Sequence, residues 1–69
     1  MTSIRIQLNG EPHGADSGIT VARLVEQLKL KPGRIAVEIN RAVVPKLSFE
    51  QTVINDGDVV EIINFVGGG

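Results

Sequence analysis

The chain has 69 residues, with seven basic and eight acidic side chains and no cysteine. A chain of this length should form one small domain that buries only about 60% of the surface its unfolded form exposes. Such a domain has no room for a deep active-site cleft. The missing cysteines exclude disulfides, thiolate metal sites and sulfur carried on a cysteine. The near-neutral charge argues against nonspecific binding to nucleic acid or membranes. No stretch approaches the ~18 apolar residues of a membrane span, and none resembles a signal peptide or a lipidation motif. We therefore expect a soluble cytoplasmic protein.

The first predicted element is a hairpin. Apolar and polar residues alternate over residues 3–8, which is the period-2 pattern of a strand with one buried face. Asn9-Gly10 tolerates the positive φ values that a two-residue turn requires, so residues 11–15 should return as an antiparallel partner. His13 has no second ligand or triad member at a suitable spacing. We expect it to be an exposed strand residue and neither a metal ligand nor a catalytic base.

A helix is predicted next, and Thr20 is its candidate N-cap. Apolar residues follow at i, i+3, i+4 and i+7, and so form one stripe: Val21, Leu24, Val25 and Leu28. Such a stripe predicts packing against a core and not a cofactor site. The sequence Lys31-Pro32-Gly33 is expected to end the helix.

A second pair of strands is predicted after the helix. Residues 35–39 alternate again between apolar and other residues. Asn40-Arg41 should turn the chain into a brief apolar strand at residues 42–44, which Pro45 ends.

A loop leads from there to the last strand. Residues 46–52 predict a connection or a single helical turn, with Phe49 as its anchor in the core. Residues 55–58 contain two aspartates, but the spacing and the distal glutamate of a calcium-binding EF-hand are missing, so we expect a plain turn. Residues 59–66 form the last and most apolar predicted strand.

The predicted order is hairpin, helix, strand pair, loop and terminal strand. This order is typical of an α+β domain in which one helix packs across one face of a mixed sheet. The first and last strands are the most apolar, so they should lie side by side in the middle of the sheet.

The last strand also predicts which of its faces is buried. Alternate residues of a strand point to opposite faces, and an unpaired charge in a small core is costly. Glu61 should therefore lie on the outer face, while Val60 and Ile62 face the core. Ile63 and Phe65 are then exposed apolar residues, and two such neighbours suggest a binding patch.

Three glycines follow this strand: Gly67, Gly68 and Gly69. Without Cβ atoms the backbone is thin and unhindered, so it can thread a narrow channel and leave the last carboxylate accessible. We expect residues 1–66 to form the folded domain and residues 67–69 a flexible tail. Taken alone, the glycines would also fit a frayed terminus or a cloning scar.

Four stretches, together with the final Gly-Gly, carry a resemblance to a known family: residues 36–41, 43–45, 56–58 and 60–63. They resemble the ThiS family of bacterial sulfur carriers of thiamine biosynthesis, and the resemblance covers the chain from Ile4 onward. It implies a ubiquitin-like β-grasp fold. It also implies a carrier that is not itself an enzyme and needs no catalytic residue, metal or cofactor of its own.

The resemblance implies a specific chemistry for the tail. In this family an ATP-dependent enzyme adenylates the carboxylate of the last glycine, which is then converted to a thiocarboxylate, and this would make Gly69 the modified residue. Adenylation creates a leaving group that a sulfur nucleophile can displace. The implied partners are the adenylating enzyme, a sulfur-donor enzyme and thiazole synthase. Because residues 67–69 span at most ~10 Å, a partner should also contact the sheet beside them, at Ile63, Phe65 and Val66.

Other classes stay open at this point. The small subunit of molybdopterin synthase is similar in fold and in its Gly-Gly end, and it uses the same sulfur chemistry for another cofactor. A stand-alone β-grasp module that binds RNA or protein is a further alternative. An independent enzyme is the weakest one, because no nucleophile and base, acidic dyad or phosphate loop can be assembled from the sequence.

Overall fold

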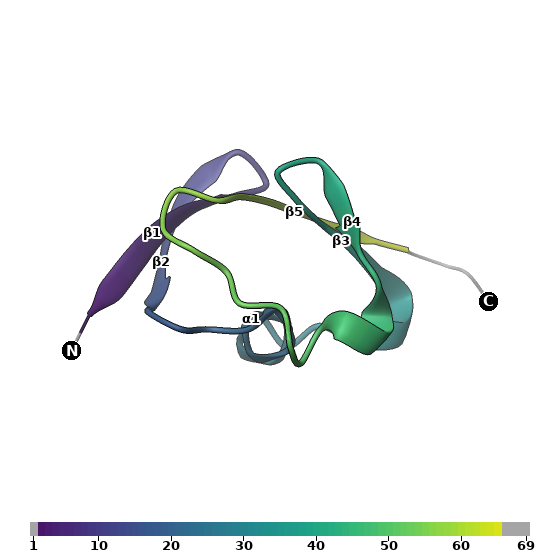
Figure 1. Ribbon diagram of the computed structural model, residues 1–69. Coiled ribbons are helices and arrows are strands. Elements are labelled where there is room, and N and C mark those ends of the chain that lie inside the picture. Colours follow the sequence, from purple (N-terminus) through teal and green to yellow (C-terminus); the bar gives the residue numbers. More distant parts are fainter. Residues whose placement is uncertain (1, 66–69) are drawn as a thin grey trace.

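The computed structural model describes residues 2–65 of the chain. In this part of the chain a five-stranded mixed sheet is covered on one face by the helix α1 (Figure 1). The elements in chain order are β1 (Ser3–Leu8), β2 (Glu11–Asp16), α1 (Val21–Gln27), the 3-10 turn η1 (Pro32–Arg34), β3 (Ile35–Ile39), β4 (Ala42–Val44), the 3-10 turn η2 (Lys46–Ser48) and β5 (Val59–Asn64). The predicted α+β architecture and the order of its elements are confirmed.

The last strand lies in the middle of the sheet. The strand order is β2-β1-β5-β3-β4, so β5 is parallel to β1 and antiparallel to β3. The predicted neighbourhood of the first and last strands is thus confirmed. Their parallel ladder, however, covers only Gln7 opposite Val59 and Leu8 opposite Val60. β1 therefore ends where β5 begins, and the rest of β5 runs on beyond it toward the opposite end of the sheet (Figure 1).

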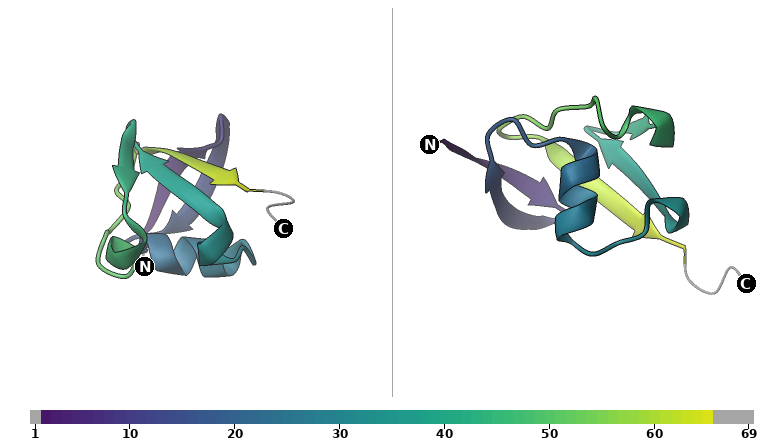
Figure 2. Two further views of the ribbon diagram at one scale, coloured as in Figure 1. Left: turned by 90° about the vertical axis from the view of Figure 1, so that its right-hand side faces the viewer. Right: turned by 90° about the horizontal axis from the view of Figure 1, so that it is seen from below.

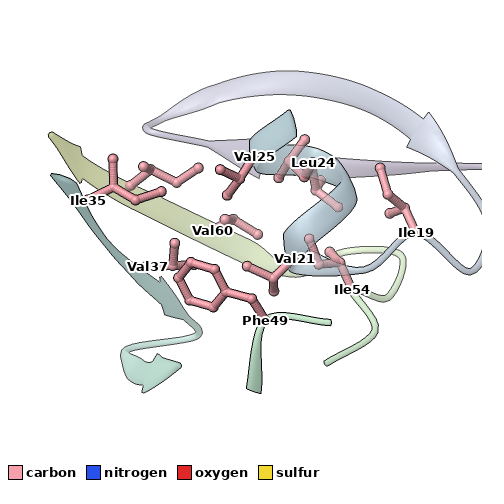
Figure 3. Close-up of a cluster of buried hydrophobic side chains, with 11 residues drawn as sticks. Ile19, Val21, Leu24, Val25, Ile35, Val37, Phe49, Ile54 and Val60 are labelled. Atoms are coloured by element: carbon pink, nitrogen blue, oxygen red, sulfur yellow. The ribbon is translucent and has the colours of Figure 1, made fainter. Parts of the chain in front are cut away.

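The core fills the space between α1 and the sheet. It consists of aliphatic side chains and one phenylalanine: Ile6, Ile19, Val21, Leu24, Val25, Ile35, Val37, Phe49, Ile54, Val60 and Ile62. Phe49 is buried as predicted, and its ring lies beside Val37 (Figure 3). Each fully buried aliphatic side chain of this kind contributes about 1.5–3 kcal/mol. This packing holds β5 against α1, which crosses it in the right-hand view of Figure 2.

The helix begins as predicted. Thr20 has an extended backbone, and its Oγ1 accepts a hydrogen bond from the Arg23 N–H at 3.1 Å, which satisfies one of the free donors of the first turn. Three members of the predicted stripe are fully buried, namely Val21, Leu24 and Val25. The stripe therefore packs into the core.

The predicted end of the helix was wrong. The helix stops at Gln27, and two residues later Lys29 adopts a left-handed conformation with φ 60°. The Leu30 N–H then donates to the Val25 carbonyl at 3.1 Å, which is the closing bond of a Schellman motif. This early reversal lets Leu30 pack against the core. Lys31-Pro32-Gly33 leads into η1 instead of ending the helix.

His13 also differs from the prediction. It lies in β2 as expected, but it is half-buried and not exposed. The reason is the register of the hairpin, in which His13 stands opposite the buried Ile6. Directly opposite residues share a face of the sheet, so His13 points to the core side at the sheet's edge strand.

Candidate functional site

The two faces of β5 have opposite character, as predicted. Val60 and Ile62 are buried, while Glu61 and Ile63 are exposed. Phe65 follows directly after the strand and is 55% exposed, a large value for a phenylalanine. The strand thus fixes its inner face in the core and presents its outer face to solvent, close in the sequence to the start of the tail.

The register extends this surface over β3 and β4. Ala36 stands opposite Ile63, Glu38 opposite Glu61, and Val43 opposite Glu38. Since opposite residues share a face, these side chains form one surface on the side of the sheet away from α1 (Figure 1). We call it the outer face: Ala36, Glu38, Val43, Val59, Glu61, Ile63 and Phe65. Four of the six exposed large apolar residues of the described chain belong to it.

Asn9 holds β5 on one side. It occupies the first position of the predicted two-residue turn with φ 51°, and Gly10 follows with φ 85°. The Asn9 Oδ1 accepts a hydrogen bond from the Ile62 N–H at 2.8 Å, and its Nδ2 donates to the Ile62 carbonyl at 3.3 Å. The side-chain amide therefore takes the place of the next β1 residue and continues the sheet where β1 has ended.

Asn40 holds β5 on the other side. It also has a left-handed backbone, with φ 52°, in the predicted turn. Its N–H donates to the Val59 carbonyl at 2.7 Å, and its Oδ1 accepts from the Val59 N–H at 2.9 Å. Its Nδ2 donates to the Asp58 carboxylate at 3.0 Å. The two hairpin turns thus flank β5 (Figure 2, left view).

The aspartates of the predicted plain turn bind the protein's own chain. The Asp56 carboxylate accepts a hydrogen bond from the Arg5 N–H, and the Asp58 carboxylate accepts one from the Asn55 N–H, both at 2.8 Å. The turn is confirmed, and its carboxylates join the start of β5 to β1 and to the Asn40 turn. Among residues 2–65 no group of three or more histidine or acidic side chains is arranged to hold a metal ion.

The predicted reactive end of the chain, Gly67 to Gly69, lies outside the described residues, as does Val66 of the predicted partner interface. The boundary between the domain at residues 1–66 and the tail at residues 67–69 likewise stays a prediction. The described residues supply a strand held in place and an exposed surface that leads to the tail. Within them, no helix is long and apolar enough to span a membrane.

Sequence reasoning found the exposure of Ile63 and Phe65 but missed the role of the two asparagines. The sequence marks both as turn formers, because asparagine adopts left-handed conformations readily. That each side chain bonds to β5 depends on the sheet order, which brings both turns to the same strand. The pairing of Glu38 with Glu61 was missed for the same reason.

Comparisons with known proteins agree with this architecture. A family model described as the ThiS family matches residues 6–69. A thiazole synthase of Magnetococcus marinus is 41% identical over 66 residues, which are 96% of this chain but only 20% of that protein. The sulfur carrier protein ThiS of Bacillus subtilis is 35% identical over 66 residues, covering 93% of this chain and 98% of that protein.

A solved structure agrees as well. The crystal structure of the thiamine biosynthesis protein ThiS from Geobacter metallireducens superposes with a TM-score of 0.81 at 33% identity, covering 96% of this chain and 100% of that one. This match confirms the expected ubiquitin-like β-grasp fold.

Proposed function

The chain belongs to the ThiS family, and from this we propose that it is a sulfur carrier of thiamine biosynthesis whose Gly69 carboxylate carries the sulfur. The matched relatives include a sulfur carrier and a thiazole synthase, which favours thiazole formation over molybdopterin synthesis. A stand-alone RNA-binding module has no support in these matches. The carrier is a co-substrate of partner enzymes and not an enzyme itself.

The proposed reaction has two steps at the last carboxylate. A carboxylate oxygen attacks the α-phosphorus of ATP, and pyrophosphate leaves, which gives an acyl adenylate. Sulfur at the oxidation level of sulfide, as hydrosulfide, then attacks the acyl carbon, the bond from this carbon to the AMP oxygen breaks, AMP leaves, and a thiocarboxylate remains. The proposed partners are an ATP-dependent adenylating enzyme, a sulfur-donor enzyme and thiazole synthase. Because the first step consumes ATP, we place the protein in the cytoplasm.

The observation that carries this proposal is the construction of β5. It is the central strand, it is bonded on both sides, and it ends at Asn64, three residues before the glycines in the sequence, with Ile63 and Phe65 exposed. A tail of three glycines spans at most ~10 Å, so a partner that reaches Gly69 must also pack on this surface. Ile63, Phe65 and Val66 are therefore the proposed partner interface.

Intact-mass spectrometry tests the chemistry. The chain ending at Gly69 is incubated with ATP, its cognate adenylating enzyme and a sulfur source. We expect the mass to rise by the difference between sulfur and oxygen, with the change located in the C-terminal fragment. A variant lacking Gly68 and Gly69 should stay unmodified and keep its melting temperature. An unmodified full chain, in the presence of an otherwise active enzyme, would refute the proposal.

A matched pair of variants tests the interface. Phe65→Ala should weaken binding to the adenylating enzyme by about 1–3 kcal/mol if Phe65 is a hot spot, with a smaller effect on folding. Leu47→Ala is the control. Leu47 is likewise an exposed apolar residue, at 96%, but it lines a groove between η2 and α1 and does not belong to the outer face. The control should bind normally. Equal binding by both variants would exclude Phe65 from the interface.

A further inference from the structure

Asn9 and Gly10 form the one asparagine-glycine pair of the sequence, and both lie exposed in the turn between β1 and β2. Asparagine is a thermolabile residue, because the backbone nitrogen of the next residue can attack its side-chain amide. Every other asparagine of the sequence precedes a residue with a side chain, which hinders that nitrogen. Gly10 has no Cβ, and no heavy atom lies within 4 Å of the position that a Cβ would take. Water and base can therefore reach this peptide bond.

The folded chain holds the Asn9 side chain away from this reaction. Both ends of its amide are bonded to the neighbouring strand, since Oδ1 accepts from the Ile62 N–H at 2.8 Å and Nδ2 donates to the Ile62 carbonyl at 3.3 Å. Attack by the Gly10 nitrogen requires the amide to turn toward its own backbone, and this rotation breaks both bonds. The longer bond belongs to Nδ2, so the nitrogen that would leave is the more weakly held end.

We propose that Asn9 is a modification site, at which spontaneous deamidation occurs when its side chain releases Ile62. Base from the solvent removes the proton of the Gly10 nitrogen, which attacks the Asn9 Cγ. The bond from Cγ to Nδ2 breaks, the leaving nitrogen takes up a proton and departs as ammonia, and a succinimide ring remains. Water then adds to one ring carbonyl carbon, and the bond from that carbon to the Gly10 nitrogen breaks. Addition at Cγ gives aspartate, and addition at the main-chain carbon gives isoaspartate.

The products cannot hold β5 as asparagine does. A carboxylate at residue 9 can still accept from the Ile62 N–H, but it has no donor for the Ile62 carbonyl, so two oxygens face each other. Isoaspartate also adds a carbon to the main chain of a turn whose length sets Leu8 opposite Glu11. Deamidation therefore loosens β5 at Ile62 and limits the lifetime of the folded chain. It does not depend on the proposed sulfur chemistry, since it uses the first turn and water alone.

Peptide mapping by mass spectrometry tests the site. The whole chain is kept at mildly alkaline pH, once folded and once in guanidinium chloride, and aspartate and isoaspartate at residues 9 and 40 are measured over time. Asn40 is the internal control, because its φ of 52° matches the 51° of Asn9 but Arg41 follows it. In the denatured chain Asn9 should be converted well before Asn40. Equal rates at the two asparagines would overturn the proposal.

The folded chain tests the protection by Ile62. Two hydrogen bonds must break before the reaction, so Asn9 should react about 10–100-fold more slowly when folded than when denatured. Equal rates in the two states would show that the bonds to Ile62 do not control the reaction. Protection beyond this range would show that the folded chain is not modified at Asn9. Either result overturns the proposal.

Two variants test the role of the following residue. Arg41→Gly should make Asn40 as reactive as Asn9 in the denatured chain, and Gly10→Ala should slow the reaction of Asn9 there. A folding defect has no influence on either rate, because both are measured in denaturant. An unchanged rate in either variant would overturn the assignment of the reactivity to the missing Cβ.

Hydrogen exchange tests the consequence for β5. Deamidated chains gain a negative charge, so ion-exchange chromatography separates them from the unmodified ones. The Ile62 amide should exchange about 5–10-fold faster in the deamidated chains, while the Val59 amide, which is bonded to Asn40, should be unchanged. Equal exchange at Ile62 in both forms would overturn the inference that deamidation loosens β5.

Discussion

The two hairpin turns use the same residue in the same conformation for different purposes. Asn9 and Asn40 have φ angles of 51° and 52°, and each bonds through its side-chain amide to β5. Asn40 bonds to Val59, one residue beyond the last pair of the ladder between β3 and β5, Ile39 with Val60, and its backbone N–H already reaches the Val59 carbonyl. Asn9 stands beyond the end of β1 and replaces a strand residue that the chain does not supply. The purpose of a turn asparagine thus depends on what the neighbouring strand lacks.

The turns also differ at their second residue. Gly10 has φ 85° and Arg41 has φ 72°. Glycine enters this left-handed region freely, whereas a residue with a Cβ does so at a cost of about 1–2 kcal/mol. The first hairpin is therefore relaxed in its backbone, and the second is strained.

The strongest test of this comparison is Asn9→Ala. It leaves both the N–H and the carbonyl of Ile62 without their partners, and we expect a loss of about 2–4 kcal/mol of unfolding free energy. Chemical denaturation measures the loss, and hydrogen exchange should accelerate first at the Ile62 amide. Asn9→Asp keeps the acceptor and loses the donor, so its effect should be intermediate. If the aspartate variant were as unstable as the alanine variant, the bond to the Ile62 carbonyl would be the important one.

Asn40→Ala should cost less, about 1–2 kcal/mol. It removes the bonds to the Val59 N–H and to Asp58, so one backbone group of β5 loses its partner, where Asn9→Ala leaves two without partners. Each variant keeps its backbone bond to β5, from Asn40 to the Val59 carbonyl or from residue 9 to the Val60 carbonyl. The faster exchange should be confined to the Val59 amide, at the far end of β5 from the tail. Faster exchange at Ile62 instead would show that the two turns are coupled.

Gly10→Ala tests only the free-energy cost of placing a residue with a Cβ in the left-handed conformation. No heavy atom lies within 4 Å of the position that a Cβ would take, so the cost comes only from the left-handed conformation and should be about 1 kcal/mol. The melting temperature should fall by roughly 4–8 °C. An unchanged melting temperature would mean that the turn adopts another conformation in the variant.

Arg41→Gly is the reverse exchange and has the smallest expected effect. Relief of the left-handed strain exceeds the extra entropy that glycine gives the unfolded chain, so the variant should gain about 0.5 kcal/mol. Denaturation of this variant alongside Gly10→Ala gives the two signs in one experiment. A loss of stability would reveal a favourable interaction of the Arg41 side chain.

Much of this fold could be predicted because local signals and tertiary packing agree. The alternation in β1, β3 and β5 and the turn pairs Asn9-Gly10 and Asn40-Arg41 are each encoded by neighbouring residues. The end of α1 could not be predicted, because Lys29 is an unusual residue for a left-handed position and its conformation follows from the packing of Leu30.

The candidate site, too, has features that the sequence predicts and features that only the folded structure reveals. Strand parity predicted that Glu61, Ile63 and Phe65 face outward, since parity is a local property. The opposition of Glu38 and Glu61 requires the register between strands that are distant in sequence. The proposed role of Gly69 rests on the family resemblance, because glycine carries no chemical signal beyond its missing side chain.

The central position of β5 has a consequence for the order of folding. Its bonds to the first hairpin join residues 53 positions apart, as from Asn9 to Ile62, and such distant pairing is slow because the intervening chain must be ordered first. Without β5 the sheet is two separate hairpins, each marginal on its own. The domain should therefore fold in one cooperative step that waits for its last strand. The same step creates the outer face, so an enzyme that docks there would distinguish folded carriers from unfolded ones before it consumes ATP.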